Sequence, residues 1–458
     1  MTPDQMTISH LRDQAKAIFQ AGVDSADPAR AVAGVLSCRD GQPVFTPHPL
    51  SPNEEEKTRK GQWERVFILS FGKAAVAMAE AAAKIIPDNL FQAPGIVVTN
   101  YENADVSIPG FEVIAAGHPL PDANGVNGAA RIAEIARSAT KDDLVLVLVS
   151  GGGSALLPLP AEGLSLDDKI ATTDLMLACG ASINDMNCVR KHLSMLKGGG
   201  LASMAAPADL HALILSDVIG DDLSTIASGP TVPDMTTFED AVGILKQRDI
   251  WEKVPATVRA RLEAGMAGDI PDTPNEKDPL FDTVSHHLIG SNTVSVHALL
   301  DAAGKDFEGE VLNYPLCGEA RDAAETLVDK ALKYKPREDG KPIAIVTGGE
   351  TTVTLKGDGM GGRNQEMALA FALAAEKKGL TGNWVFLSGG TDGRDGPNDA
   401  AGGVVDPGSL ERMRAEGGEP SAFLDNNDSY HALEKAQDLL MTGPTGTNVA
   451  DLQIFLRT

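Results

Sequence analysis

A lysine stands where a strand-like segment ends and a helix-like segment begins. Residues 65–70 (RVFILS) have the apolar, β-branched character of a buried strand, and Gly72 and Lys73 lead into a helical pattern over 74–86. A positive charge at a helix start opposes the helix dipole, which makes a purely structural lysine unfavourable there. The same position suits a lysine that binds a transferred phosphoryl group beside the helix N-terminus. GxxxxGK[ST] appears nowhere in the chain, so this is not a Walker A loop.

Three consecutive glycines follow a second buried strand, residues 144–150 (LVLVLVS). The loop Gly151–Gly153 is flanked by Ser150 and Ser154. Backbone N–H groups in such a loop can approach a ligand without obstruction by Cβ atoms, which suits a phosphate or a carboxylate. The structural alternative is a tight turn that binds nothing. We expect this loop to bind an anionic group.

Carboxylates follow strand-like segments at two further places. Asp217 and Asp221 come after an apolar run, and Asp392 lies in a glycine-rich loop after another. Such carboxylates can hold Mg²⁺ through one or two ligands and waters, or accept the proton of an attacking hydroxyl. The structural alternative is helix capping by Asp222 or Ser224.

Arg363 follows a glycine-rich stretch at the start of a predicted helix, where its planar fork is placed to meet an anion. The stretch, residues 357–362, also matches the G-x-G-x-x-G dinucleotide pattern. That pattern expects an acidic residue about 20 positions on, at the end of the next strand. The nearest candidate, Asp392, is some 30 positions away in its own glycine loop, so a dinucleotide site is disfavoured.

The elements that position these residues alternate between apolar strands and amphipathic helices. This alternation predicts parallel βαβ units and, for the first half, a doubly wound sheet. Ligands of such sheets sit at the carboxyl ends of the strands, where the loops converge. Here those loops carry lysine, arginine and aspartate beside glycine, which predicts an enzyme.

The length of 458 residues allows two or three domains. The polar, Pro- and Asp-rich segment 268–282 has no helical or strand period and predicts an exposed connection. We therefore predict an N-terminal α/β domain over 1–275 and a smaller α/β domain over 283–458. The segment 40–61, rich in Pro, Glu and Lys, predicts a surface excursion.

The composition limits the partners. Asp and Glu outnumber Lys and Arg by 64 to 39, a formal charge of −25, which disfavours nucleic acid and anionic membranes. The four cysteines form no CxxC pair and predict free thiols in a reducing compartment. The chain contains no signal-like apolar core and no apolar run near the roughly 20 residues of a membrane span. We expect a cytoplasmic protein.

Eight long motifs occur in an order that resembles the glycerate 2-kinase family, whose C-terminal part is the MOFRL domain and whose members often carry the name hydroxypyruvate reductase. The motifs are SFGKAA, GHPLPD, VSGGGSALLPLP, INDMNCVRKHLSMLKGG, LSDVIGDDLSTIASGPT, GGETTVTLKGDGMGGRNQE, SGGTDGRDGP and TGPTGTNV. The resemblance covers roughly residues 10 to 455.

The resemblance implies ATP-dependent phosphorylation of D-glycerate to 2-phosphoglycerate, with ATP and Mg²⁺ as cofactors. It implies a Rossmann-like N-terminal domain, a smaller MOFRL domain and an active site in the interdomain cleft. The expected catalytic residues are Lys73, Arg363, Asp217 and Asp392, and the expected metal ligands are Asp217, Asp221 and Asp392. The expected substrate and nucleotide contacts are Gly72, Ser150, Gly151, Gly152, Gly153, Ser154, His118, Arg190, Glu350, Asn364 and Asn448.

Two other functions stay open at this point. One is an NAD(P)H-dependent hydroxypyruvate reductase, which needs a nicotinamide site. The other is a non-catalytic protein that binds a metabolite on the same scaffold. The residues leave open which loop binds adenine, which carboxylate acts as base and whether the chain forms a homo-oligomer.

Overall fold

The computed structural model describes residues 7–46, 59–312, 315–334 and 341–458. The chain forms two compact units. One contains residues 28–216 and 221–289, and we call it the parallel-sheet unit. The other contains the described residues up to Asp27 together with 217–220 and 290–458, and we call it the mixed-sheet unit. Within the described ranges, no helix has the length and apolar character to cross a membrane.

The parallel-sheet unit is built on six strands in the order β6-β5-β4-β7-β8-β9. Their bounds are β4 (Arg65–Phe71), β5 (Gly95–Asn100), β6 (Phe111–Ala116), β7 (Asp143–Val149), β8 (Asp209–Leu215) and β9 (Val284–Gly290). Strand β4 pairs in parallel with both β5 and β7, so the strand order reverses between β4 and β7. This is the doubly wound arrangement predicted from the sequence, and its switch point is where ligands bind in such folds.

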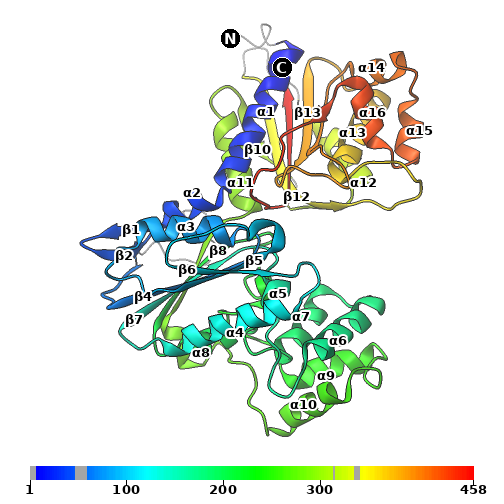
Figure 1. The fold of residues 1–458 in the computed structure, drawn as a ribbon. Coiled ribbons are helices and arrows are strands. Elements are labelled where there is room, and N and C mark those ends of the chain that lie inside the picture. Colours follow the sequence, from blue (N-terminus) through cyan, green and yellow to red (C-terminus); the bar gives the residue numbers. More distant parts are fainter. Residues whose placement is uncertain (1–6, 47–58, 313–314, 335–340) are drawn as a thin grey trace. The chain divides into compact units, whose positions relative to one another are not determined.

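Helices cover both faces of this sheet (Figure 1). α2 (Pro28–Val35) and α3 (Ala75–Ile85) pack together on one face, and α4 (Ala123–Ser138) and α8 (Gly200–Ala205) pack on the other. Strands β4 and β7 are buried almost throughout because both faces are covered.

A small antiparallel sheet of β1 (Leu36–Arg39), β2 (Gln42–Phe45) and β3 (Arg59–Lys60) occupies part of the segment predicted as a surface excursion. Asp40 and Gly41 both have positive φ angles, 52° and 76°, as a two-residue hairpin requires. Residues 47–58 of that segment lie outside the described residues.

A helical cluster extends the parallel-sheet unit between β7 and β9. It contains the short α5 (Gly153–Leu156) and the longer α6 (Leu166–Ala178), α7 (Ile183–His192), α9 (Phe238–Gln247) and α10 (Ala256–Ala267). Met186, Phe238 and Leu262 belong to its own apolar core. Capping boxes start α6, α7 and α9, so local sequence defines these helix ends. This cluster was not predicted, and it carries two of the cations described below.

The mixed-sheet unit contains strands in the order β10-β12-β16-β13-β14-β15, with β11 also paired to β12. Their bounds are β10 (Glu308–Val311), β11 (Leu316–Glu319), β12 (Ile343–Thr352), β13 (Trp384–Gly390), β14 (Gly402–Val405), β15 (Leu439–Leu440) and β16 (Asp451–Arg457). Strands β12 and β13 are not direct neighbours in this sheet. β16 lies between them and runs antiparallel to both, which makes the sheet mixed.

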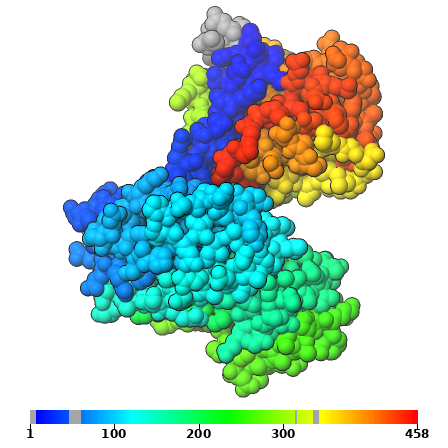
Figure 2. Space-filling model, in the orientation of Figure 1, coloured from blue at the N-terminus to red at the C-terminus, as the bar shows by residue number. Residues whose placement is uncertain are grey.

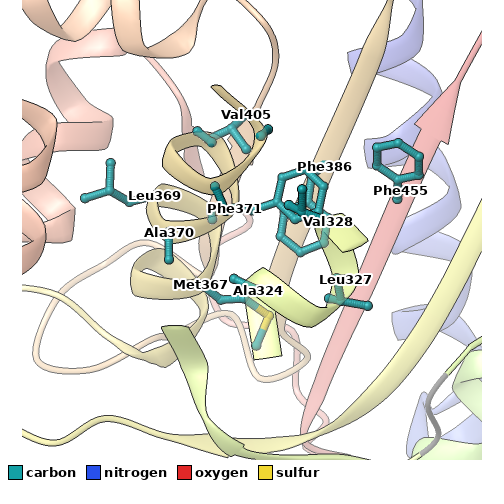
Figure 3. Close-up of a cluster of buried hydrophobic side chains, with 14 of the residues drawn as sticks. Ala324, Leu327, Val328, Met367, Leu369, Ala370, Phe371, Phe386, Val405 and Phe455 are labelled. Atoms are coloured by element: carbon teal, nitrogen blue, oxygen red, sulfur yellow. The ribbon is translucent and has the colours of Figure 1, made fainter. Parts of the chain in front are cut away.

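Helices also cover both faces of the mixed sheet. α1 (Ile8–Ser25) and α11 (Asn292–Ala303) form an apolar core with one face, and Phe19 and Leu299 are buried there. α12 (Ala320–Ala331) and α13 (Arg363–Lys378) pack on the other face, followed by α14 (Ser409–Ala415), α15 (Pro420–Asp425) and α16 (Ser429–Ala436). Figure 3 shows this second core, in which the Phe371 and Phe386 rings stack with centroids 4.0 Å apart.

The division of the chain differs from the predicted boundaries at two points. Helix α1 packs with the C-terminal segments rather than with the N-terminal domain, because its buried side chains Leu11, Ile18 and Phe19 complete the core of the mixed sheet. In Figures 1 and 2 the blue N-terminal helix lies against orange and red segments. Strand β9, in turn, belongs to the parallel-sheet unit, because it forms the sixth strand there.

Arg12 connects α1 to the rest of the mixed-sheet unit through salt bridges. Its guanidinium bonds Asp406 at 2.5 Å and Asp438 at 2.9 Å, and both carboxylates are buried. We expect Arg12→Ala to lower the free energy of unfolding by about 1–3 kcal/mol, because two buried carboxylates lose one of their cationic partners. The loss should not be larger, because Arg412 still pairs with both carboxylates. Urea denaturation would measure this, with Lys16→Ala on an exposed position of the same helix as the control. Equal midpoints for the two variants would contradict the assignment.

Candidate active site

The two predicted loops meet at the switch point of the parallel sheet. The Lys73 N–H donates to the Gly151 carbonyl at 2.9 Å, and the Ala74 N–H donates to the Ser150 hydroxyl at 3.1 Å. Gly72 has a φ of 120°, and a Cβ there would lie 2.2 Å from the Ser150 Oγ. Only glycine fits this contact. The loops after β4 and β7 therefore form one structure.

Lys73 and His118 lie beside the glycine loop. A Cβ added to Gly152 would lie 3.1 Å from the His118 ring and 3.3 Å from the Lys73 Cγ. The Lys73 side chain is exposed. Burial, and then the charge of Lys73, lower the pKa of His118 below its ordinary value. His118 is therefore neutral at physiological pH and can take part in hydrogen bonding without adding charge.

Not every predicted contact in this loop is open to a ligand. Ser150 is buried, and its hydroxyl accepts the Ala74 N–H, so it holds the loops together. Gly153 is buried against Phe71 and Ala227. Gly151, Gly152 and Ser154 are partly exposed, and the Ser154 hydroxyl is 2.9 Å from that of Ser228.

A cavity of about 470 Å³ lies next to the glycine loop, within the parallel-sheet unit. His118, Gly152 and Ser154 line it, together with three cationic residues, Lys169, Arg190 and Lys197. Of these three cations, the sequence prediction named only Arg190.

The three cations have no acidic partner among the residues that the structure describes. The Lys169 Nζ donates to the Pro158 carbonyl at 2.8 Å, and the Lys197 Nζ donates to the carbonyls of Ser154 and Ala227 at 3.0 and 3.4 Å. Among the described residues, no carboxylate forms an ion pair with Lys169, Arg190 or Lys197. In a chain of net charge −25, such a local group of basic side chains favours an anion over a cation as a ligand.

Burial shifts the lysines of the cavity towards the neutral state. Desolvation, and then the charge of Arg190, lower the pKa of Lys169 to about 7. Desolvation also lowers the pKa of Lys197 well below its ordinary value. An anion would restore the charged forms, so anion binding and proton uptake support one another.

We expect the affinity for a polyanion to fall by up to about tenfold per pH unit above about pH 7, because binding must then protonate Lys169. Arg190, Lys197, His118 and Asp174 line the same cavity and modulate this slope. Isothermal titration with tripolyphosphate from pH 6.5 to 9 would measure it. The stability of the ligand-free protein should depend on pH in the opposite direction. Above about pH 7, Lys169 is neutral in the folded state and takes up a proton on unfolding, so its contribution to the free energy of unfolding grows as the pH rises.

Lys169→Met is the matching variant, and we expect it to bind tripolyphosphate more weakly and with a shallower pH slope. An unchanged slope in this variant would contradict the assignment to Lys169.

Arg363 is already paired in the mixed-sheet unit. Its Nε and Nη2 bond the two carboxylate oxygens of Asp451 at 2.6 and 3.0 Å, and its Nη1 bonds Glu350 at 2.8 Å. Three of the five guanidinium N–H donors are thus occupied, and two remain for a ligand. The sequence prediction of a free arginine waiting for an anion was incomplete, since Asp451 was not recognised as its partner.

The glycine-rich stretch before α13 packs against the protein itself. The Asp395 carboxylate accepts the backbone N–H groups of Asn364 and Gln365 at 3.1 and 2.7 Å. A Cβ on Gly359 would lie 2.4 Å from Asp428, and one on Gly362 would lie 2.3 Å from Asp395. The helix start that a dinucleotide pyrophosphate would occupy therefore holds an internal carboxylate. This agrees with the sequence argument against a dinucleotide site.

The remaining predicted contacts of the mixed-sheet unit differ in exposure. Asn364 is buried, and its side chain bonds Ser388 and Asp395, which leaves it a structural role in this conformation. Asn448 is partly exposed, and its side chain accepts the Ala450 N–H. Glu350 and Asp392 are exposed.

The predicted metal ligands are divided between the two units. Asp217 belongs to the mixed-sheet unit and Asp221 to the parallel-sheet unit, while Asp392 bonds the Arg394 N–H. Across the part of the chain that the structure describes, no group of three or more His, Cys, Asp or Glu side chains is arranged to hold a metal. This is compatible with Mg²⁺, which is commonly bound by one or two carboxylates and substrate phosphates.

Sequence reasoning missed Lys169 and Lys197. Lys169 lies in a helix whose pattern LDDKIATTDLMLA reads as an ordinary surface helix, yet it is buried. Lys197 lies in the quoted motif that ends KGG, directly before Gly198 and Gly199 with φ of 55° and 79°. That lysine-glycine pairing, as at Gly72–Lys73, was the available signal.

The fold and the site define a two-unit α/β protein with a cavity lined by basic side chains beside the switch point of its parallel sheet. Two family models match the chain. One, described as a domain of unknown function (DUF4147), matches residues 14–263, and the MOFRL family model matches residues 343–451.

Similar proteins carry glycerate kinase names. A D-glycerate 2-kinase of Thermotoga maritima is 44% identical over 405 residues, covering 88% of this chain and 93% of that protein. A glycerate 2-kinase of Pyrococcus horikoshii is 40% identical over 462 residues, covering 99% of both. A solved glycerate kinase structure from Thermotoga maritima has a TM-score of 0.85 at 39% identity and covers 98% of this chain and 100% of its own.

The chain belongs to the glycerate 2-kinase family, with its DUF4147 and MOFRL regions. The sequence prediction of the family and of the two-domain α/β fold is confirmed. A relative from Agrobacterium vitis, 40% identical over 452 residues that cover 97% of this chain and 94% of that protein, bears a provisional hydroxypyruvate reductase name.

Proposed function

We propose that this chain transfers the γ-phosphoryl group of ATP to the 2-hydroxyl of D-glycerate, giving 2-phosphoglycerate and ADP. The observation that carries the proposal is the group of cations beside the glycine loop that form no ion pair with any described carboxylate. Both substrates are anions, and the net charge of the chain would repel them elsewhere. The relatives named glycerate 2-kinase support the same activity.

Phosphoryl transfer depends mainly on positioning and on neutralising charge. The glycerate 2-hydroxyl oxygen attacks the γ-phosphorus, the bond from that phosphorus to the bridging oxygen breaks, and ADP leaves with the bond electrons. Lys73 is exposed beside the glycine loop, and we assign it to the charge of the transferring group. Gly151, Gly152 and Ser154 would orient an anionic group through N–H and hydroxyl donors.

Arg363 is the second proposed catalytic cation, and it belongs to the mixed-sheet unit. Asp451 orients its guanidinium through two hydrogen bonds, and two N–H donors remain for the substrate. A carboxylate must accept the proton of the 2-hydroxyl, and Asp217, Asp221 and Asp392 are the candidates. Mg²⁺ would arrive with the nucleotide and neutralise phosphate charge, with Asp392 as an exposed carboxylate available to it.

The reductase alternative needs a site for the nicotinamide dinucleotide. The glycine-rich stretch that matches the dinucleotide pattern leads into a helix start whose N–H groups already donate to Asp395. No observation in the structure therefore favours this activity. A non-catalytic metabolite-binding role would need the same pocket but no turnover.

The deciding experiment incubates the protein with D-glycerate and MgATP and identifies the product by ³¹P NMR. We expect 2-phosphoglycerate, and a parallel incubation with hydroxypyruvate and NADH should show no oxidation of NADH. Formation of 3-phosphoglycerate would overturn the proposed position of transfer. Absence of any phosphorylated product from an active-site-intact, folded sample would overturn the proposed activity.

A further inference from the structure

We propose that the cavity beside the glycine loop is the nucleotide subsite, with the adenine on an apolar wall and the phosphates against the cations. The inference rests on the proposed kinase function and assigns ATP binding to the parallel-sheet unit. Three features of the cavity support this assignment: its lining, its size and its charge.

One wall of the cavity is apolar and comes from two elements. The loop after β6 contributes Pro119, Leu120 and Pro121, and α6 contributes Leu166, Ile170 and Leu177. The α6 positions are spaced by four and seven residues, so they lie along one helical face. A flat, largely apolar purine ring suits such a wall better than a small hydroxy acid does.

Two of these side chains are unusually exposed for large apolar residues. Leu120 is 70% exposed and Leu177 is 59% exposed, and both line the same cavity. Apolar side chains gathered at one opening in a highly charged protein indicate a ligand that covers them. Scattered exposed residues elsewhere, such as Met235, do not line this cavity.

The size of the cavity also favours the nucleotide. Its volume of about 470 Å³ falls within the range of roughly 300–1,000 Å³ typical of sites for larger organic ligands. Glycerate, a three-carbon acid, would leave most of it unfilled.

The charge of the cavity matches a polyphosphate. Lys169, Arg190 and Lys197 line one cavity, where, besides burial, the charge of Arg190 lowers the pKa of both lysines. Glycerate carries only one negative charge to compensate this group. A triphosphate supplies several charges. The glycine loop and Ser154 line the same cavity, so a phosphate chain bound there leads towards Lys73.

The test separates the base from the phosphates. We expect Leu120→Asp/Leu177→Asp to weaken binding of ATP and adenosine by about tenfold or more, because a carboxylate replaces the apolar contact with the base. Arg190→Met should weaken binding of ATP and tripolyphosphate but not of adenosine. Equilibrium titration measures each ligand without turnover, and steady-state kinetics then gives the KM values of ATP and glycerate. Met235→Asp, equally exposed in the same unit, is the matched control.

The outcomes distinguish this inference from the proposed function. A raised ATP KM with an unchanged glycerate KM supports the nucleotide subsite. Normal glycerate phosphorylation with unchanged ATP affinity in all variants overturns the subsite and leaves the kinase activity standing. A raised glycerate KM alone reassigns the cavity to the acceptor and also overturns the inference. Wild-type binding of ATP that the variants weaken, without phosphorylation of glycerate, supports the subsite and overturns the proposed activity.

Discussion

Replacing Lys73 by methionine should lower kcat for glycerate phosphorylation by about 10²–10³-fold, because a positioned donor for transition-state charge is lost. Lys73 is exposed and forms no side-chain hydrogen bond or ion pair with the described residues, so the substitution should leave the fold intact. Steady-state kinetics with circular dichroism as a check on folding would measure both effects.

Lys84→Met is the matched control, since Lys84 is an exposed lysine in the last turn of the same helix α3. We expect it to retain turnover close to that of the unaltered enzyme. If Lys73→Met behaves like Lys84→Met, Lys73 is a surface residue and the proposed mechanism loses its first cation.

Replacing Arg363 by alanine should cost both stability and activity. Asp451 is buried, and burial raises its pKa while Arg363 opposes that shift. Without the arginine, the carboxylate is left uncompensated, and the free energy of unfolding should fall by about 3 kcal/mol. Turnover should fall by about 10²-fold or more as well, because the remaining guanidinium donors are lost.

The double variant Arg363→Ala/Asp451→Asn separates the two effects. The neutral amide removes the uncompensated charge, so we expect most of the stability to return while activity stays low. Denaturant melts and kinetics on the same samples would measure this. Recovery of turnover together with stability would mean that Arg363 acts only in the fold.

The sequence was sufficient to predict the two loops that lie at the switch point of the parallel sheet. Gly72–Lys73 and the glycines from Gly151 each follow a strand directly, so local pattern and the rule for parallel sheets place them together. The structure joins them through the Lys73 N–H and the Gly151 carbonyl. That these two strands, β4 and β7, are direct neighbours was not predicted and is seen only in the structure.

Residues whose role depends on tertiary burial could not be predicted in the same way. Lys169 and Lys197 line the cavity only because the helical cluster and the loop around Ala227 remove them from water. Asp451 pairs with Arg363 across 88 positions of sequence, and β16 is inserted between two strands that precede it. No local periodicity carries that information.

The N-terminal helix has a consequence for how the MOFRL region can be produced alone. Helix α1 belongs to the mixed-sheet unit, and the parallel-sheet unit follows it in sequence. Apart from residues 217–220, the chain returns to the mixed-sheet unit only at residue 290. A fragment that starts near residue 283 would lack the helix that buries Phe19 against the sheet, and it would expose that apolar surface to aggregation. A folded fragment should instead need residues 7–27 supplied by fusion, in effect a rearranged chain order that brings the helix back to its sheet.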